Sequence, residues 1–411
     1  MDNFSEIRSG WRLLLSAMLG TGLGLPPLLF YSIGIFAPIL AKEFGWSFAS
    51  IFGGLSLMTF TLLLGGPLAG HFVDRYGARK VAAISLSALG ISYMTLALSS
   101  GSIVQYYASW LAMAVFGLGA TPISFTEAIS SAFVKQRGLA LGITLAGVGL
   151  FVLSVKPLAN WLLNIGGWRV AIVGIGLLPL MVGTPAVLWG FPVAQGIGVI
   201  RNKKVQHSSI GDLTLREALR TRTFWILIVA LVPMSFASAA PFPNMENILR
   251  SVHISPGEIV ALSSLIGIAI VTGRLIGGWL IDRIWAPLVG AILLSGASLG
   301  AWILSQHVVS NHEAMLAIIL LGLATGVELS LVSYLVGRYF GFRSYGVIYG
   351  ALFGVFAVGA ASGPSLLGYA YDRAGSYSQI MQICALLFLC AAGMLIGLGR
   401  YPVSVAETTS N

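Results

Sequence analysis

Charged residues are scarce in this sequence of 411 amino acids. They make up 9% of it, while hydrophobic residues make up 57%, and the mean hydropathy is +0.90. A water-soluble globular protein carries about 25% charged residues. The deficit excludes a set of soluble domains. It predicts a protein that crosses a membrane several times, with the lipid bilayer as its main surrounding partner.

The residue types on which most enzymes and metal sites depend are also few. The two cysteines, Cys384 and Cys390, stand six residues apart in one apolar run, a spacing that suits neither a metal site nor a disulfide. The 5 histidines are scattered, and no GxxxxGK loop followed by Ser or Thr is present to cradle nucleotide phosphates. The sequence therefore predicts no metal, no cofactor and no catalytic residues, and it argues against a hydrolase and an ATP-driven pump.

Twelve apolar runs fill the chain instead. They lie at 11–40, 48–72, 81–100, 103–133, 139–163, 169–191, 224–243, 257–281, 286–305, 315–337, 345–370 and 379–399. About 20 apolar residues in a helix cover the roughly 30 Å hydrocarbon core of a bilayer. We therefore predict an all-α membrane protein of twelve transmembrane helices. Residues 1–191 and 224–411 would form two six-helix bundles, joined by a polar cytoplasmic linker at 192–223 whose tail could form a short amphipathic helix.

Lysine and arginine are distributed unevenly among the loops. With the amino terminus inside, the outer segments carry only four of the 23, namely Lys42, Arg169, Arg250 and Arg373. An excess of these residues marks cytoplasmic loops. The distribution predicts a multi-pass protein of the cell (inner) membrane with both termini cytoplasmic. It also accounts for the net charge of +9 without a nucleic-acid partner.

Four ionisable side chains fall within the predicted spans: Glu127, Lys156, Arg274 and Glu328. A charge inside the membrane costs at least about 2.5 kcal/mol and usually faces a cavity or a partner. We expect Arg274 to hold a substrate carboxylate by a bidentate hydrogen bond. Glu328, near mid-membrane, is the better proton carrier because burial disfavours a charged carboxylate, and Glu127 is the second candidate.

Each of these assignments has an alternative. A static pair of Arg274 and Glu328 would only join two helices. Lys156 precedes Pro157 and could bind a second carboxylate, or it could extend its amine toward the membrane surface. Glu127 could equally form a gate ion pair with the loop at 135–137.

Neutral polar and aromatic side chains could complete a binding site. The substrate-contact candidates are Tyr31, Thr121, Asn244 and Tyr349, and residues that could shape the site further are Ser124, Ser330 and Tyr334. Aromatic and hydroxyl groups suit a small, partly apolar acid. Helix packing is the alternative role for each of them.

The two halves of the sequence repeat each other. GGPLAGHFVDR at 65–75 aligns with GRLIGGWLIDR at 273–283 at an offset of 208 residues, which pairs Gly70 with Gly278 and Asp74 with Asp282. Repeated six-span units suggest two bundles that rock about a central site. Arg274 falls where the first half has Gly66, and such a departure from the repeat indicates a functional position.

The stretch GGPLAGHFVDRYGARK at 65–80 resembles the loop motif between helices 2 and 3 of the major facilitator superfamily. The matching residues are Gly66, Gly70, Asp74, Arg75, Gly77, Arg79 and Lys80. In that family the motif is a gating latch and not a substrate site, and the resemblance implies the same role here. His71, inside the motif, is expected only to pack.

Further stretches resemble the bacterial branch of the monocarboxylate and oxalate/formate transporter group. They are FYSIGIFAPILAKEFGWS at 30–47, RGLALGITLAGVG at 137–149, LTLREALRTRTFW at 213–225 and RYFGFRSYGVIYG at 338–350. That group carries small organic anions, often with a proton, and its characteristic arginine in helix 8 is matched by Arg274. Ile270 stands where animal members have an aspartate, which leaves the proton site open. Leu352 stands where the oxalate carrier has a lysine, which argues against oxalate.

These observations predict a secondary active transporter of a small organic anion that works as a monomer. They favour a monocarboxylate moved with protons by alternating access. The alternatives are an antiporter of a dicarboxylate or an aromatic acid, a drug exporter, and a transporter-derived sensor. The fifth predicted helix has no Gly-Pro motif, which counts against drug export.

Overall fold

The computed structural model describes residues 5–192 and 212–402, and all regular structure within them is helical. The first half contains α1 (Ser5–Ser9), α2 (Trp11–Gly22), α3 (Leu25–Phe44), α4 (Phe48–Tyr76), α5 (Ala78–Met94), α6 (Ile103–Phe116), α7 (Pro122–Ala132), α8 (Arg137–Leu178) and α9 (Thr184–Gly190). The second half contains α11 (Leu215–Ala218), α12 (Arg222–Ala239), α13 (Met245–Ser251), α14 (Pro256–Ile281), α15 (Ala286–Leu304), α16 (Asn311–Tyr339), α17 (Tyr345–Ala374) and α18 (Ser378–Ile396).

Ten helical stretches among the described residues are long and apolar enough to cross a membrane. The difference from the twelve predicted runs has two local causes. The stretch 137–190 contains two of the runs, and they are divided where Gly166 and Gly167 leave helical geometry. Gly167 has φ +74°, which glycine adopts without strain. The run 103–133 is broken at Gly117 into α6 and α7, each too short to count alone.

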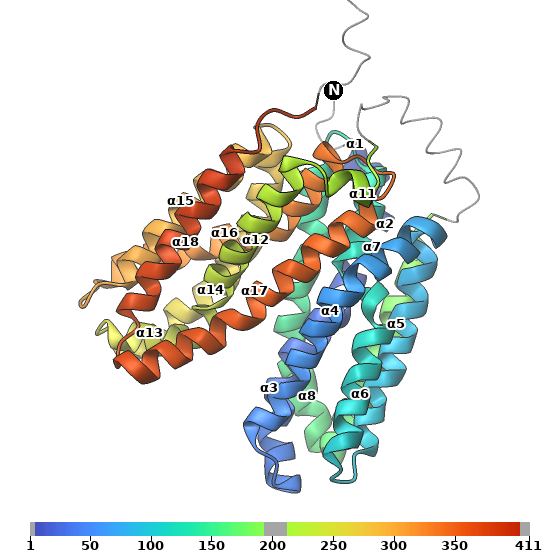
Figure 1. Cartoon of the computed structure of the whole chain (residues 1–411). Helices are drawn as coiled ribbons and strands as arrows, with labels where there is room; N and C mark the ends of the chain where they lie inside the picture. The colour runs from blue at the N-terminus through green and yellow to red at the C-terminus, as the bar shows by residue number, and fades with distance from the viewer. Residues whose placement is uncertain (1–4, 193–211, 403–411) are drawn as a thin grey trace, which may run out of the picture.

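The helices form two bundles (Figure 1). The helices up to α9 make one bundle, and those from α12 onward make the other. The bundles converge at the end that carries α1 and α11, and they diverge toward the opposite end. We call these the closed end and the open end. Some glycines on helices of both bundles face unfilled space. No atom lies within 4 Å of the position that a Cβ would take at Gly34, Gly267 or Gly368.

Two helix crossings join the bundles at the closed end. In the first, α4 packs on α17, and a Cβ at Gly70 would stand 1.9 Å from the carbonyl oxygen of Gly346. In the second, α14 packs on α8, and a Cβ at Gly278 would stand 2.4 Å from the carbonyl oxygen of Gly138. The offset of 208 that relates Gly70 to Gly278 also relates Gly138 to Gly346. The crossings are therefore pseudo-symmetric copies, and glycine allows the two backbones of each to touch.

The tail of the predicted linker forms a short helix, as expected, although it is only one turn long. In α11 the Thr214 hydroxyl accepts a hydrogen bond from the backbone N–H of Glu217, and the Glu217 carboxylate bonds back to Thr214. The backbone N–H and the hydroxyl of Thr214 hold the pKa of Glu217 below its usual range. Residues 193–211 of the predicted linker lie outside the described part of the chain.

Candidate functional site

Arg274, the predicted anion-binding residue, lies on α14 where the two bundles meet. Its backbone carbonyl oxygen packs against α8, at 2.1 Å from where a Cβ on Gly142 would stand. Its side chain is partly buried, and Nη1 donates a hydrogen bond to the backbone carbonyl oxygen of Leu145, also on α8. The guanidinium group of one bundle therefore binds the backbone of the other.

Two further predicted residues lie within electrostatic range of Arg274, namely Tyr31 on α3 and Glu328 on α16. Tyr31 is 38% exposed although it lies well inside its helix. Glu328 is only 2% exposed, and its carboxylate accepts a hydrogen bond from the Ser238 hydroxyl on α12. Within the described residues, Arg274 and Glu328 thus interact through space and do not form a direct ion pair.

Lys156 lies on the α8 face that contains Gly149, because seven residues make nearly two helical turns. A Cβ at Gly149 would contact Val271 of α14, so this face is directed toward the second bundle. The Lys156 side chain is exposed. It follows Leu145 by eleven residues, about 16 Å along the helix. Because of that separation, a small acid bound to Arg274 would not reach Lys156.

The other neutral candidates lie apart from the Arg274 cluster. Thr121 and Ser124 are fully buried, and their hydroxyls donate to the carbonyls of Leu118 and Gly119 at 2.8 and 2.6 Å, where the chain breaks between α6 and α7. Asn244 lies in the turn Phe242–Asn244 beyond α12.

Tyr349 and Tyr334 are also buried, and neither is an electrostatic neighbour of Arg274. Tyr349 is fully buried in a stack of rings along α17, at 5.8 Å from Tyr345 and 6.1 Å from Phe353. Tyr334 is 8% exposed, and the Ser330 hydroxyl donates to the Val327 carbonyl at 2.8 Å. The structure thus places Tyr31 and Glu328 within electrostatic range of Arg274, and the remaining candidates lie apart from this group.

Two carboxylates close the helix crossings at the closed end. Asp74 accepts hydrogen bonds from the backbone N–H groups of Gly346 at 2.8 Å and Val347 at 3.1 Å, at the start of α17. Asp282 accepts the equivalent bonds from Gly138 at 2.6 Å and Leu139 at 3.0 Å, at the start of α8. The first N–H groups of a helix have no partner within the helix and carry its positive dipole end. Each carboxylate therefore clamps one bundle to the other.

Comparison with known proteins decides the family of this chain. A sequence model of the Major Facilitator Superfamily matches residues 13–364. The chain belongs to the Major Facilitator Superfamily. It is similar to monocarboxylate transporter 13 of Bos taurus, with 28% identity over 97% of this chain and 92% of the relative. It is also similar to the oxalate:formate antiporter of Oxalobacter formigenes, with 28% identity over 56% of this chain and 53% of the relative.

Solved structures confirm the major facilitator fold. The E. coli fucose:proton symporter FucP superposes with a TM-score of 0.70 at 15% identity, over 96% of this chain and 100% of that one. The human organic anion transporter TETRAN superposes with a TM-score of 0.68 at 18% identity, over 94% and 99% of the two chains. This chain is a membrane transporter of two pseudo-symmetric bundles, and its family is one of transporters and not of enzymes.

The superfamily motif residues around Asp74 make contacts of several kinds. Gly66 faces Gly350 at the α4–α17 crossing, and Gly77 ends α4 with φ +84°. Arg79 donates to the Leu188 carbonyl at 2.6 Å. The remaining motif cations, Arg75 and Lys80, are exposed, and the Arg75 guanidinium lies 5.4 Å from the ring of Tyr76. His71, which we expected to pack, is exposed, and its ring lies 6.3 Å from that of Phe72.

A carboxylate that the sequence did not single out contacts the loop before α8. One Glu6 oxygen accepts the backbone N–H groups of Val134, Lys135 and Gln136 at 3.3, 3.0 and 3.1 Å. Glu127, the second candidate proton carrier and the alternative partner of this loop, lies within electrostatic range of Tyr345. Nothing in the sequence near Glu6 signals this contact. In contrast, the 208-residue repeat applied to Gly346 would have identified Gly138 as a partner of Asp282.

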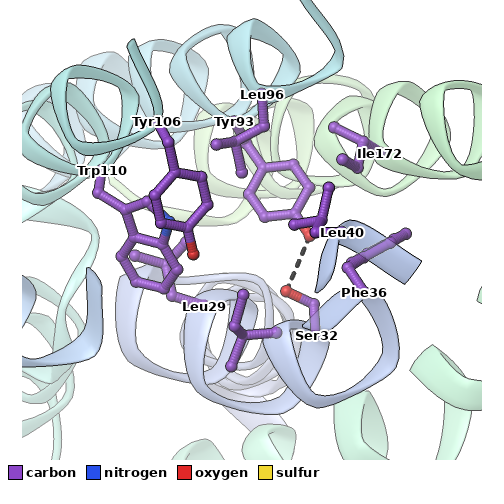
Figure 2. A pocket seen from close by; sticks show the side chains of 10 residues that line it. Leu29, Ser32, Phe36, Leu40, Tyr93, Leu96, Tyr106, Trp110 and Ile172 are labelled. Carbon is purple, nitrogen blue, oxygen red and sulfur yellow. Dashed lines mark hydrogen bonds between the residues drawn. The ribbon is translucent and has the colours of Figure 1, made fainter. Parts of the chain in front are cut away.

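The enclosed cavity of the first bundle is not a substrate site (Figure 2). It measures about 10 Å³, which is the space for a single water molecule. Apolar and aromatic side chains line most of it, and the Tyr93 hydroxyl donates to the Ser32 hydroxyl at 2.8 Å across it. The Arg274 cluster between the bundles is therefore the candidate substrate site.

Proposed function

We propose that this chain moves a small monocarboxylate together with a proton by alternating access, with Arg274 as the carboxylate-binding residue. The observation that carries the proposal is the position of its guanidinium group, which reaches from α14 to the backbone of α8 between the two bundles. The similarity to monocarboxylate transporters supports the same substrate class. A single cation in the Arg274 cluster suits one carboxylate better than two.

Substrate binding would change the link between the bundles. In the empty site Arg274 donates to the neutral Leu145 carbonyl. A carboxylate can accept two parallel N–H bonds from a guanidinium group, and such charge-assisted bonds are stronger than bonds to a carbonyl. A bound acid would therefore displace Leu145 and free α8 from α14 at this level. Occupancy of the site and relative motion of the bundles are coupled in this way.

A proton on Glu328 would favour substrate binding. The ionised carboxylate lies within electrostatic range of Arg274 and opposes a second negative charge there. Protonation removes this repulsion while Ser238 keeps the side chain hydrogen-bonded. Proton and substrate then bind with mutual preference, which is the thermodynamic requirement for symport.

The chain would have a defined orientation in the membrane and would work as a monomer. Lys42, Arg250 and Arg373 stand in the last turns of α3, α13 and α17, and Arg169 pairs with Glu43 at the end of α3. These helix ends lie toward the open end, so the closed end, with both termini, would face the cytoplasm of a cell (inner) membrane. The structure then represents the state open to the outside. Residues 1–191 and 224–411 would be the moving units, 192–223 their linker, and one chain would suffice for transport.

The test is uptake of labelled lactate, pyruvate, benzoate and oxalate into proteoliposomes, with and without an inward proton gradient. We expect the gradient to stimulate uptake of one or more of the monocarboxylates. Exchange of acids that ignores the gradient would instead support antiport, the candidate that the oxalate:formate antiporter favours. Uptake of none of these acids, combined with drug resistance that depends on the protein, would contradict both.

A further inference from the structure

A cation-rich cavity lies at the closed end, and none of its lining residues belongs to the Arg274 cluster. It has a volume of about 820 Å³. Three arginines line it: Arg283 follows α14, Arg338 lies on α16, and Arg400 follows α18. Asp282 is the one acidic residue that lines it, so the lining carries a net charge of +2. All of its lining residues belong to the second bundle.

Arg283 and Arg338 are held in place by aromatic rings and not by carboxylate partners. The Arg283 guanidinium stacks at 4.0 Å from the Trp279 ring, and that of Arg338 lies 4.6 Å from the Tyr401 ring. Within residues 5–192 and 212–402, none of the three forms an ion pair. Arg283 uses one donor, Nη1, on the Trp279 carbonyl oxygen at 3.2 Å. The other donors of a guanidinium group stacked on an aromatic ring remain available to an anion.

The chain segment that presents Arg400 is fixed on both sides. The carbonyl oxygen of Gly399 accepts a hydrogen bond from the Tyr339 hydroxyl at 2.6 Å. The hydroxyl of Tyr401 accepts a hydrogen bond from the Ala286 backbone N–H at 3.0 Å. Arg400 therefore projects from an anchored turn beside the other two arginines, and the cavity is a built feature of the fold.

We propose that this cavity binds a phosphate-bearing anion, either the headgroup of an anionic phospholipid or a soluble phosphate compound. Guanidinium groups match the oxygens of phosphate by bidentate hydrogen bonds. The cavity is lined by residues that follow α14 and α18 and by the last turns of α16, at an end of the bundle that both lipid headgroups and solutes can reach. Its volume exceeds what inorganic phosphate needs, so it accommodates a larger group that carries the phosphate.

The bound anion stabilises the closed end through Asp282. In the present state this carboxylate is directed into α8, where two backbone N–H groups neutralise it. When α8 separates from α14, Asp282 loses both donors and becomes a competitor for the arginines of the same cavity. The anion therefore binds more tightly while this end is closed. By reciprocity it slows opening there.

Binding is tested on the purified full-length protein in detergent with two probes. Native mass spectrometry counts retained phosphatidylglycerol, and equilibrium dialysis measures labelled inorganic phosphate. We expect Arg338→Gln and Arg400→Gln each to weaken binding about tenfold, as the loss of a hydrogen bond to a charged group does. Arg216→Gln, which removes an exposed cation of α11 outside the cavity, is the matched control and keeps the parent affinity.

Retention of the lipid alone identifies a headgroup site, and retention of phosphate alone identifies a site for a soluble compound. Parent affinity for both probes in the two cavity variants, or no binding of either probe by the parent, overturns the proposal. Because no substrate is used, this result is independent of whether the chain transports a monocarboxylate.

The effect on the gate is tested with a reporter cysteine, Ser130→Cys, in a background that lacks Cys384 and Cys390. Ser130 is fully buried between the bundles at the closed end, 3.4 Å from the Ser333 hydroxyl. We expect the bound anion to slow labelling by a water-soluble maleimide severalfold, and Arg338→Gln to abolish that slowing. Labelling that the anion leaves unchanged or accelerates would overturn the regulatory step.

Discussion

At the scale of the residue, one substitution between the two halves distinguishes the transport site. The repeat places Gly66 against Gly350 in the α4–α17 crossing, and it places Arg274 against Gly142 in the α14–α8 crossing. Both crossings keep close backbone contact, but only the second carries a guanidinium group into the space between the bundles. An arginine there has to bind something, since a buried unpaired cation is costly.

Replacement of Arg274 measures its contribution to substrate binding. We expect Arg274→Lys to lower uptake at low substrate concentration about tenfold, because a lysine forms no bidentate contact. Arg274→Ala should lower it by about 100-fold or more, at about 1.5–3 kcal/mol for each lost charge-assisted hydrogen bond. Initial rates in proteoliposomes measure both. Arg373→Lys, at an exposed arginine of the open end, is the control, and parent-level uptake by the alanine variant would contradict the assignment.

Replacement of Glu328 separates proton coupling from binding. In the parent, we expect the substrate KM to rise with pH, because an ionised Glu328 opposes a second anion near Arg274. Glu328→Gln keeps a hydrogen-bond partner for Ser238 and stays neutral at every pH. Its KM should be independent of pH, and gradient-driven accumulation should be lost while exchange continues. A variant that still accumulates substrate on a proton gradient would exclude Glu328 as the proton carrier.

At the scale of the element, glycine decides how closely the bundles approach. The α4–α17 and α14–α8 crossings have backbone contacts at Gly70 and Gly278 that leave no room for a Cβ. Lipid provides no hydrophobic force between helices, so such a crossing is held together by van der Waals contact between closely approaching backbones. Because the backbones fit so closely, a small increase in side-chain size at Gly70 or Gly278 would break these contacts.

Adding one methyl group tests this fit. Gly70→Ala and Gly278→Ala should each destabilise the closed end by about 1–3 kcal/mol, the usual cost of overpacking. Maleimide labelling of the Ser130→Cys reporter should accelerate accordingly. Gly267→Ala is the matched control, since a Cβ there has no atom within 4 Å and labelling should stay at the parent rate. If all three variants label alike, the crossings do not hold this end closed.

At the scale of the whole molecule, the closed end rests on two equivalent carboxylate clamps. Asp74 clamps the first bundle to α17, and Asp282 clamps the second bundle to α8. Because each crosses the same interface in the opposite direction, either one restrains the rocking of both bundles. The two bundles therefore contribute equivalent contacts to the closed end, as the pseudo-symmetry of the fold requires.

Weakening the clamps should therefore shift the whole molecule toward the alternate state. An asparagine has one acceptor oxygen in place of two and no charge for the helix dipole. We expect Asp74→Asn and Asp282→Asn each to increase reporter labelling severalfold, and the double variant to exceed both. Glu313→Gln, which alters the first turn of α16 remote from the interface, is the control. Unchanged labelling in the double variant would show that the clamps do not set the conformation.

The sequence by itself determined the class of this molecule, because the scarcity of charge and the length of the apolar runs depend only on local composition. It also determined the two-fold repeat, the superfamily motif around Asp74 and the intramembrane position of Arg274. The break at Gly117 escaped prediction, since apolar composition continues through the run 103–133. The break at Gly166 and Gly167 falls between the predicted runs 139–163 and 169–191.

Only the tertiary structure decided which of the candidate residues meet. It placed Tyr31 and Glu328 near Arg274, gave Glu328 a partner in Ser238, and gave Arg274 the Leu145 carbonyl. These contacts join helices that are remote in the sequence, and one of the partners is a backbone atom, which every residue possesses. No pattern along the chain encodes such a contact, because it depends on how two bundles cross in space.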